Sequence, residues 1–240
     1  MYGPPCPLTW RVAVEPPALS DSAIHLWRLR TGEDGDDPDK GLAWLSPAQQ
    51  ARVAALRDPA VGARYARAQI GLRRVLAAYL DCHPAEIAFG HGPRGKPHLV
   101  GPGNQAAGLQ FNLTTTGDLA LVAVARGAPL GVDCERVRPR ESLDAIARRM
   151  LPEAVAAALA ALPPSARLEQ FHLAWTALEA DVKADGRGLA LRREPLTAPP
   201  GIGHCLAAPG HIAAVARIGL APPPTWTGLE LPAVGPGSAL

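Results

Sequence analysis

Apolar and polar positions follow helical patterns in both halves of the chain. Ser46 followed by Pro47 is typical of a helix start, with serine as the N-cap and proline at the first helical position. Apolar residues at helical spacing predict a second helix over about residues 60–80 and a long one over about 165–184.

Unbroken apolar runs predict buried strands between these helices. Leu119–Ala125 is one such run, and Leu130–Val137 follows it after a turn at residues 126–129. Consecutive strands joined by a short turn usually pair, so we expect an antiparallel hairpin here. Ile24–Leu29 is expected to be a further extended segment.

Other segments carry the composition of irregular structure, and the chain has 24 glycines and 26 prolines. Residues 1–20 are proline-rich, residues 31–40 are acidic and lack apolar side chains, and the segment after Pro222 is rich in proline and glycine. We expect an irregular N-terminus, a surface loop and a loosely held tail, respectively.

The mixture of helices and short antiparallel strands predicts an α+β fold, with two lobes joined near residues 112–118. The expected parts are an N-terminal lobe (1–115), a C-terminal lobe (116–222) and a Pro/Gly-rich tail (223–240).

Charge and hydropathy argue against several classes of protein. The 240-residue chain has a net charge of +2, whereas nucleic-acid binding usually needs a concentrated basic surface. The N-terminus lacks signal-peptide features, and the apolar stretch Ala154–Leu162 is too short to cross a bilayer. The four cysteines show no spacing typical of metal sites or disulfide frameworks. We therefore expect a cytoplasmic protein with neither nucleic-acid nor membrane partners.

The strand around Asp133 and Glu135 carries candidate chemistry. Because side chains alternate along a strand, these two carboxylates point to one face, and Val132 and Cys134 point to the other. Two carboxylates so placed can share a divalent cation that prefers oxygen ligands. A solvated strand face with no ion is the alternative.

The long helix offers a third carboxylate. Trp175, Glu179 and Lys183 are spaced four apart and therefore lie along one row of the helix. Glu179 can complete a magnesium site with open positions for substrate phosphates, and Lys183 adds a cation one turn further on. From the spacing alone, a surface ion pair between them worth about 0.3–0.5 kcal/mol is the simpler explanation.

Five segments in consistent order resemble the motifs of Sfp-type 4'-phosphopantetheinyl transferases. Gly131–Glu135 is similar to the G-[IV]-D-x-E motif, and Phe171–Lys183 to the F-x-x-x-W-x-x-x-E-[AS]-x-x-K motif. Gly186–Leu189 resembles the G-x-G-L segment that follows. Upstream, Gly95–Pro97 matches the G-K-P loop, and Phe111–Leu113 begins the F-N-[ILV]-[ST]-H-[ST] segment.

This resemblance implies a single chain folded as a pseudo-dimer of two similar α+β lobes, hence a monomer, with a ligand cleft between the lobes. Coenzyme A would bind in that cleft as the co-substrate, and Mg²⁺ would hold its diphosphate. A serine of an acyl- or peptidyl-carrier protein would attack the phosphate that bears the pantetheine arm, and adenosine 3',5'-bisphosphate would leave. The carrier protein is the implied partner, and the pathway stays open.

Matched by position, the resemblance also implies roles for individual residues. Asp133, Glu135 and Glu179 would hold Mg²⁺. Glu179 would serve as the base for the serine hydroxyl, with Lys183 as the second catalytic residue. The residues expected to bind coenzyme A are Lys96, Lys183, Arg94, Arg67, Thr115 and Arg187.

Three positions depart from the family pattern, and each departure removes a possible cation. Thr115 replaces a histidine that contacts the coenzyme, Leu178 stands where many members have lysine, and Gln69 stands where arginine is usual. Losing two or three charged hydrogen bonds would cost about 3–9 kcal/mol, less if neighbours compensate.

Three functions therefore stay open. The first is an active transferase in which other cations restore the contacts, the candidates being Arg64, Arg67, Arg73, Arg94 and Arg187. The second is a different enzyme that keeps the carboxylates but acts on another phosphorylated or carrier-bound substrate. The third is a non-catalytic carrier-binding module, and retention of Asp133, Glu135 and Glu179 counts against it.

Overall fold

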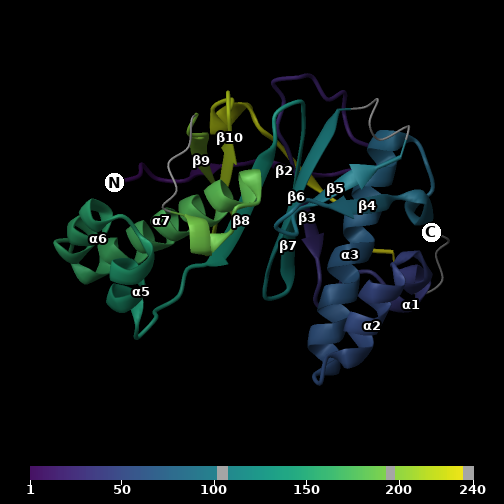
Figure 1. The fold of residues 1–240 in the computed structure, drawn as a ribbon, viewed down its shortest axis with the longest axis horizontal. Coiled ribbons are helices and arrows are strands. Elements are labelled where there is room, and N and C mark those ends of the chain that lie inside the picture. Colours follow the sequence, from purple (N-terminus) through teal and green to yellow (C-terminus); the bar gives the residue numbers. More distant parts are fainter. Residues whose placement is uncertain (102–107, 193–197, 235–240) are drawn as a thin grey trace.

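The computed structural model describes residues 1–101, 108–192 and 198–234 (Figure 1). Its strands are β1 (Cys6–Pro7), β2 (Trp10–Val12), β3 (His25–Arg30), β4 (Ala88–His91), β5 (Pro97–Val100), β6 (Leu109–Thr116), β7 (Leu119–Arg126), β8 (Leu130–Arg136), β9 (Gly201–Ala208), β10 (His211–Arg217) and β11 (Thr227–Glu230). Its helices are α1 (Pro38–Gly41), α2 (Pro47–Ala55), α3 (Pro59–Leu80), α5 (Leu143–Met150), α6 (Glu153–Ala160) and α7 (Pro164–Asp185). The fold is α+β, which confirms the predicted class.

The two halves of the chain repeat one order of elements. In the first half β3 is followed by α1, α2, α3, an additional hairpin β4–β5 and then the hairpin β6–β7. In the second half β8 is followed by α5, α6, α7 and the hairpin β9–β10. In each half the second hairpin strand pairs antiparallel with the first strand, β7 with β3 and β10 with β8. The helices α3 and α7 are both 22 residues long. This repeat is what a chain with two lobes of similar topology is expected to show.

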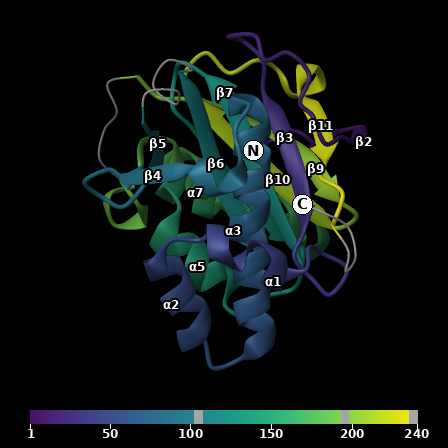
Figure 2. The same ribbon diagram turned by 90° about the vertical axis from the view of Figure 1, so that its right-hand side faces the viewer.

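The elements stack in four layers. A five-stranded sheet has the order β2-β11-β3-β7-β6, and a four-stranded sheet has the order β1-β9-β10-β8. Figure 2 shows α3 lying across the outer face of the five-stranded sheet, where Leu76 packs with Trp27. The inner faces of the two sheets form a second cluster that includes Leu121 and Val132. On the far side, Ala180 of α7 packs on the outer face of the four-stranded sheet.

The start of α2 agrees with the sequence prediction. The backbone N–H of Gln49 donates to the Ser46 hydroxyl, and the backbone N–H of Ser46 donates to the Gln49 side chain. Pro47 occupies the first helical position. This reciprocal cap satisfies backbone groups that the first turn of a helix leaves unpaired.

The prediction that the strands at 119–125 and 130–137 pair as a hairpin is wrong. β7 pairs with β3 and β6 in one sheet, whereas β8 pairs with β10 in the other. The turn between them carries the chain across to the second sheet, where Arg217 donates hydrogen bonds to the backbone carbonyls of Ala128 and Arg126. An apolar run shows that a strand is buried on both faces, but it does not identify its partner.

Segments expected to be irregular are ordered by distant parts of the chain. β11 lies between β2 and β3 and pairs parallel with both, so the expectation of a loosely held tail is wrong for residues 223–234. The remaining tail residues, 235–240, lie outside the described part of the chain. Asp36, in the expected surface loop, is buried and forms an ion pair of 2.7 Å with Arg74.

Across the described ranges, no helix has the length and apolar character needed to cross a membrane.

Candidate active site

The candidate site lies where β8 packs against α7. Asp133 is opposite Ala214 of β10, which contacts α7, so Asp133 lies on the helix-facing side of the sheet. The two elements approach so closely at Gly131 that a Cβ there would lie 2.0 Å from the carbonyl oxygen of Ala180. Because only glycine allows this approach, the sequence itself brings the strand carboxylate next to the helix.

Asp133 is buried and bound on one oxygen only. Its Oδ1 accepts hydrogen bonds from Lys183 Nζ at 2.6 Å and from Thr114 Oγ1 at 3.0 Å. Its Oδ2 is buried and has no hydrogen-bond partner among the described residues. The structure thus brings together two residues that the sequence placed in one site, and it leaves a buried carboxylate oxygen for a further ligand.

Glu135 has a different neighbour. Its Oε2 accepts a hydrogen bond from Arg140 at 3.2 Å, a residue that the sequence did not single out. The buried His172 lies close by: burial lowers its pKa, and the positive charge of Arg140 lowers the pKa further. The Leu168 carbonyl, 2.9 Å from His172 Nδ1, and the charge of Glu135 oppose these shifts, but the pKa of His172 is lowered on balance. The surroundings therefore favour a neutral imidazole.

Glu179 shares the electrostatic environment of the strand carboxylates. Burial raises the pKa of Glu179, the Lys183 ammonium lowers it, and the charges of Asp133 and Glu135 raise it again. Glu179 also lines a cavity of about 290 Å³ together with Lys183, Lys96 and Arg94. The strand carboxylates Asp133 and Glu135 therefore affect the pKa of the helix carboxylate Glu179 across the β8–α7 contact.

The residues of the predicted magnesium site are of the type that binds Mg²⁺, but their side chains do not lie close enough together to coordinate one ion. Within residues 1–101, 108–192 and 198–234, no group of three or more His, Cys, Asp or Glu side chains is arranged to hold a metal ion. Lys183 and Arg140 neutralise Asp133 and Glu135 instead. The donor set still fits Mg²⁺, since it offers hard oxygen ligands, an unpartnered buried oxygen and carboxylates that repel one another. The three-carboxylate site stays a prediction.

Lys96 reaches the site but turns its ammonium to the backbone. Its Nζ donates hydrogen bonds to the carbonyl of Leu130 at 2.9 Å and to the carbonyl of Ala184 near the end of α7. Burial lowers the pKa of Lys96 to about 8, and the charge of Asp185 opposes this shift. A cation at the C-terminal end of a helix is favourable, so Lys96 fixes its loop against the β8–α7 contact.

Other residues expected to bind coenzyme A have structural partners or are exposed. Arg187 is buried and binds Asp181 and Asp185 of its own segment. Arg67 donates to backbone carbonyls of the segment before α1. Thr115 is exposed on β6, where it faces away from Asp133. Their roles as ligands stay predictions, because in this conformation the two arginines stabilise the fold.

A larger cavity of about 720 Å³ adjoins the first, between α2, α3 and β4. It holds polar groups that the sequence did not single out, above all Gln49, whose side-chain amide donates to Gln69 at 2.8 Å and whose Oε1 accepts from Arg73 at 3.2 Å. The Arg73 guanidinium also lies 5.1 Å from the centre of the Phe89 ring, over its face. Burial lowers the pKa of Arg73. A glutamine within a helix gives no signal in the sequence, so this network could be found only from the fold.

Asn112 connects the two sheets beside the site. Its side-chain oxygen accepts a hydrogen bond of 2.8 Å from the backbone N–H of Val132 in β8. The sequence identified Asn112 as part of a motif but did not give it a role. The structure shows that it holds the edge strand β6 against the strand that carries Asp133.

The chain is similar in sequence to a known family and to several known proteins. The family model of the 4'-phosphopantetheinyl transferase superfamily matches residues 129–215, from just before β8 into β10. The 4'-phosphopantetheinyl transferase HetI of Nostoc sp. is 33% identical over 176 residues, which cover 73% of this chain and 73% of that protein. The chain belongs to the 4'-phosphopantetheinyl transferase superfamily.

Two further relatives of this transferase match shorter stretches. A protein of Synechocystis sp., provisionally named 4'-phosphopantetheinyl transferase, is 31% identical over 148 residues, or 62% of this chain and 59% of that protein. The 4'-phosphopantetheinyl transferase of Bacillus subtilis is 29% identical over 120 residues, or 50% of each chain. The stretch matched by the family model includes all four residues predicted to form the metal and catalytic centre, namely Asp133, Glu135, Glu179 and Lys183.

Proposed function

We propose that this transferase moves the 4'-phosphopantetheine arm from coenzyme A to a serine of an acyl- or peptidyl-carrier protein in a Mg²⁺-dependent reaction. The observation that carries the proposal is the ion pair of Asp133 with Lys183 across the β8–α7 contact, beside a cavity lined by Glu179, whose pKa responds to the charges of both residues. The names of the curated relatives support the transferred group. The repeated topology of the two halves supports two lobes with the ligand between them.

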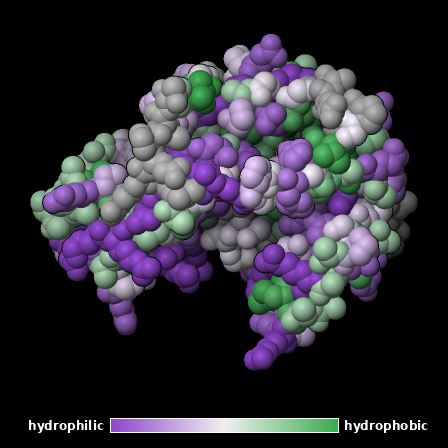
Figure 3. Space-filling model, in the orientation of Figure 1, coloured by the Kyte–Doolittle hydropathy of each residue, from purple (hydrophilic) through white to green (hydrophobic). Residues whose placement is uncertain are grey.

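The two adjoining cavities offer room for an extended nucleotide. The cavity between α2, α3 and β4 and the cavity beside Glu179 share the lining residues Pro97, Asn112 and Leu113. Figure 3 shows a hollow in the surface between the part that carries α5 and α6 and the part that carries α1 and α2. We place the nucleotide end of coenzyme A in the larger cavity and its diphosphate beside Lys183.

Asp133, Glu135 and Glu179 would hold the magnesium ion. The ion would neutralise charge on the diphosphate and on the leaving group, as is usual where carboxylates bind a metal with open positions. The unpartnered Oδ2 of Asp133 supports its part in this set.

The protein side chains position and deprotonate the reactants. The serine oxygen bonds to the phosphorus that bears the pantetheine arm, and the bond from that phosphorus to the oxygen of the adenosine 3',5'-bisphosphate breaks, so the bisphosphate leaves with the electron pair. Glu179 accepts the serine proton. Its raised pKa makes it a stronger base than an exposed carboxylate. Lys183 supplies positive charge next to the transferred phosphate.

Mass spectrometry tests the proposal directly. Incubation with Mg²⁺, coenzyme A and an apo carrier protein should add the mass of the phosphopantetheine arm to the carrier. Glu179→Gln should slow this transfer by about 10²–10⁴-fold, the usual contribution of a general base. Glu169→Gln, at an exposed position of the same helix, is the matched control and should leave the rate unchanged. Equal rates for the two variants would contradict the role of Glu179.

One set of observations favours a second candidate, an enzyme that acts on a different phosphorylated or carrier-bound substrate. Gln69, Thr115 and Leu178 remove cations, and Arg67 and Arg187, which were candidates to replace them, are engaged in the fold. Calorimetry with Mg²⁺ and coenzyme A separates the two proposals. Absence of coenzyme binding to a folded protein would favour this second candidate.

A further inference from the structure

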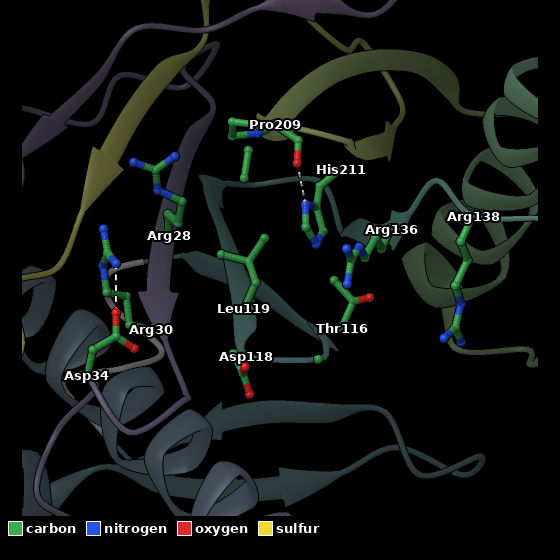
Figure 4. Close-up of a pocket in the computed structure, with 12 residues that line it drawn as sticks. Arg28, Arg30, Asp34, Thr116, Asp118, Leu119, Arg136, Arg138, Pro209 and His211 are labelled. Carbon is green, nitrogen blue, oxygen red and sulfur yellow. Dashed lines mark hydrogen bonds and ion pairs between the residues drawn. The ribbon is translucent and has the colours of Figure 1, made fainter.

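A further cavity opens between the two sheets and shares no lining residue with the cavities at the candidate active site. Its volume is about 630 Å³, and it is lined by the ends of β3 and β8 and by the β6–β7 and β9–β10 turns. Figure 4 shows Arg136, His211 and Thr116 pointing toward one space from β8, β10 and β6. Side chains from both sheets therefore converge on this cavity.

Four arginines line this cavity, and two of them are already paired. Arg28 and Arg30 both bind Glu230, and Arg30 also binds Asp34 at 2.7 Å. Arg28 lies 4.8 Å over the ring of Trp10 as well. These contacts hold one wall of the cavity in place and neutralise its charge.

The other two arginines, Arg136 and Arg138, are unpaired. Both side chains are exposed, and neither has a hydrogen-bond or ion-pair partner among the residues that the structure describes, while the backbone of Arg136 pairs with His211 in the sheet. The remaining acidic lining residue, Asp118, is bound by Arg64 at 2.6 Å. The cavity thus keeps uncompensated positive charge next to the Thr116 hydroxyl, and Leu119 and Pro209 add apolar surface.

This cavity is separate from the candidate active site. It shares no lining residue with the two cavities at α2, α3 and α7. Arg136 follows Glu135 in β8, and strand alternation turns it to the face opposite the helix-facing carboxylates. An anion bound here would therefore not occupy the position of the transferred phosphate.

We propose that this cavity binds a small phosphorylated anion through Arg136 and Arg138. Planar guanidinium groups bind phosphate oxygens with two parallel hydrogen bonds, and the volume is within the range of small-molecule sites. Arg28 and Arg30, held by Glu230 and Asp34, form the fixed opposite wall. The chemistry suits a free diphosphate as well as a phosphate ester with a nucleoside-sized body.

Calorimetry of the whole protein in a chelating buffer without Mg²⁺ tests this site, with inorganic pyrophosphate and adenosine 5'-monophosphate as separate probes. We expect saturable binding of one anion per chain. Arg136→Gln combined with Arg138→Gln should weaken it on the order of tenfold or more, since hydrogen bonds to charged groups are lost. Tighter binding of the nucleotide would identify an ester as the ligand class, and tighter binding of pyrophosphate would identify a free diphosphate.

Two controls separate this site from charge effects and from the active site. Arg57→Gln combined with Arg148→Gln removes the same charge at exposed positions elsewhere and should leave binding within about twofold. Lys183→Ala should also leave binding intact. The proposal is overturned if neither probe saturates, if the charge control weakens binding equally, or if Lys183→Ala abolishes it. If neither probe binds while the Arg136/Arg138 variant loses carrier-protein affinity, the cavity is a protein-docking surface instead.

Discussion

Single charged residues in this protein are positioned by partners far away in the sequence. The sequence predicted Asp133 and Lys183 as members of one site, and the ion pair between them follows from the packing of β8 on α7. By contrast, the residue type alone could not show that Arg67 and Arg187 form hydrogen bonds and ion pairs within the protein. An arginine in the sequence has the same appearance whether it binds a ligand or a neighbouring carbonyl.

A buried polar cluster around His25 gives a pH-dependent contribution to stability. Trp27 Nε1 donates to the Tyr79 hydroxyl at 2.8 Å, and the same hydroxyl lies 2.7 Å from His25 Nδ1. Because the tryptophan can only donate, the hydroxyl hydrogen is free to point at His25, which then accepts it in its neutral form. Burial lowers the pKa of His25 to about 4, and the charge of Arg11 lowers it too.

We predict that His25 makes the fold less stable in mild acid. The unfolded chain takes up a proton on this histidine below its ordinary pKa of 6.5, whereas the folded protein does so only near 4. The stabilisation is therefore complete above about pH 6.5 and is lost as the pH falls toward 4, by roughly 3 kcal/mol in all. Urea unfolding at pH 7 and pH 4.5 measures it.

The matched variant for this prediction is His25→Gln, which cannot titrate in that range. Its free energy of unfolding should be lower than that of the wild type at pH 7 but should fall less between the two pH values. The difference between the two slopes isolates His25 from other titrating groups, including His172 and His204. Parallel slopes would show that His25 titrates normally in the folded protein.

At the scale of elements, the sequence predicted the helices better than the pairing of the strands. Helix starts carry local signals, such as the cap at Ser46, because the first turn must satisfy its own backbone groups. β7 and β8 carry equally clear apolar patterns, yet their partners come from distant segments. Alternation in β8 and the helical row in α7 are local patterns, so the sequence could nominate the residues of the candidate site, but it needed the motif resemblance to choose them over a surface ion pair. The fit between the two elements is not a local pattern.

Gly131 is the position at which that fit can be tested. We predict that Gly131→Ala destabilises the protein by about 1–3 kcal/mol or more, because the added methyl group overlaps the Ala180 carbonyl and forces α7 away from β8. The shift would also separate Glu179 from Asp133, so transferase activity should fall more steeply than the folded fraction. Urea unfolding and the carrier-protein mass assay measure the two effects.

Gly92→Ala is the control for this substitution. Its nearest neighbour is the Lys96 carbonyl oxygen at 3.7 Å, an ordinary contact, so stability should change little. If Gly131→Ala behaves like Gly92→Ala in both assays, the close packing of α7 on β8 does not position the site.

At the scale of the whole molecule, the ends of the chain complete both sheets. β1 adds to the four-stranded sheet, and β2 adds to the outer edge of the five-stranded sheet beside β11. The sequence suggested irregular ends because proline and glycine are frequent there, and composition does not reveal pairing with strands more than a hundred residues away. The repeated halves are therefore joined by terminal strands as well as by the packing of their inner faces.

The C-terminal strand should consequently be essential for folding. A chain that ends at Pro222 loses β11 together with the buried side chains of Trp226, Leu229 and Leu231. Burying three such side chains contributes roughly 5–9 kcal/mol, which is comparable to the whole stability of a typical domain. We predict that the shortened chain shows no cooperative urea transition by circular dichroism, whereas a chain that ends at residue 234 keeps these contacts and unfolds cooperatively. If both chains unfold at the same urea concentration, β11 is an accessory strand and the five-stranded sheet is stable without it.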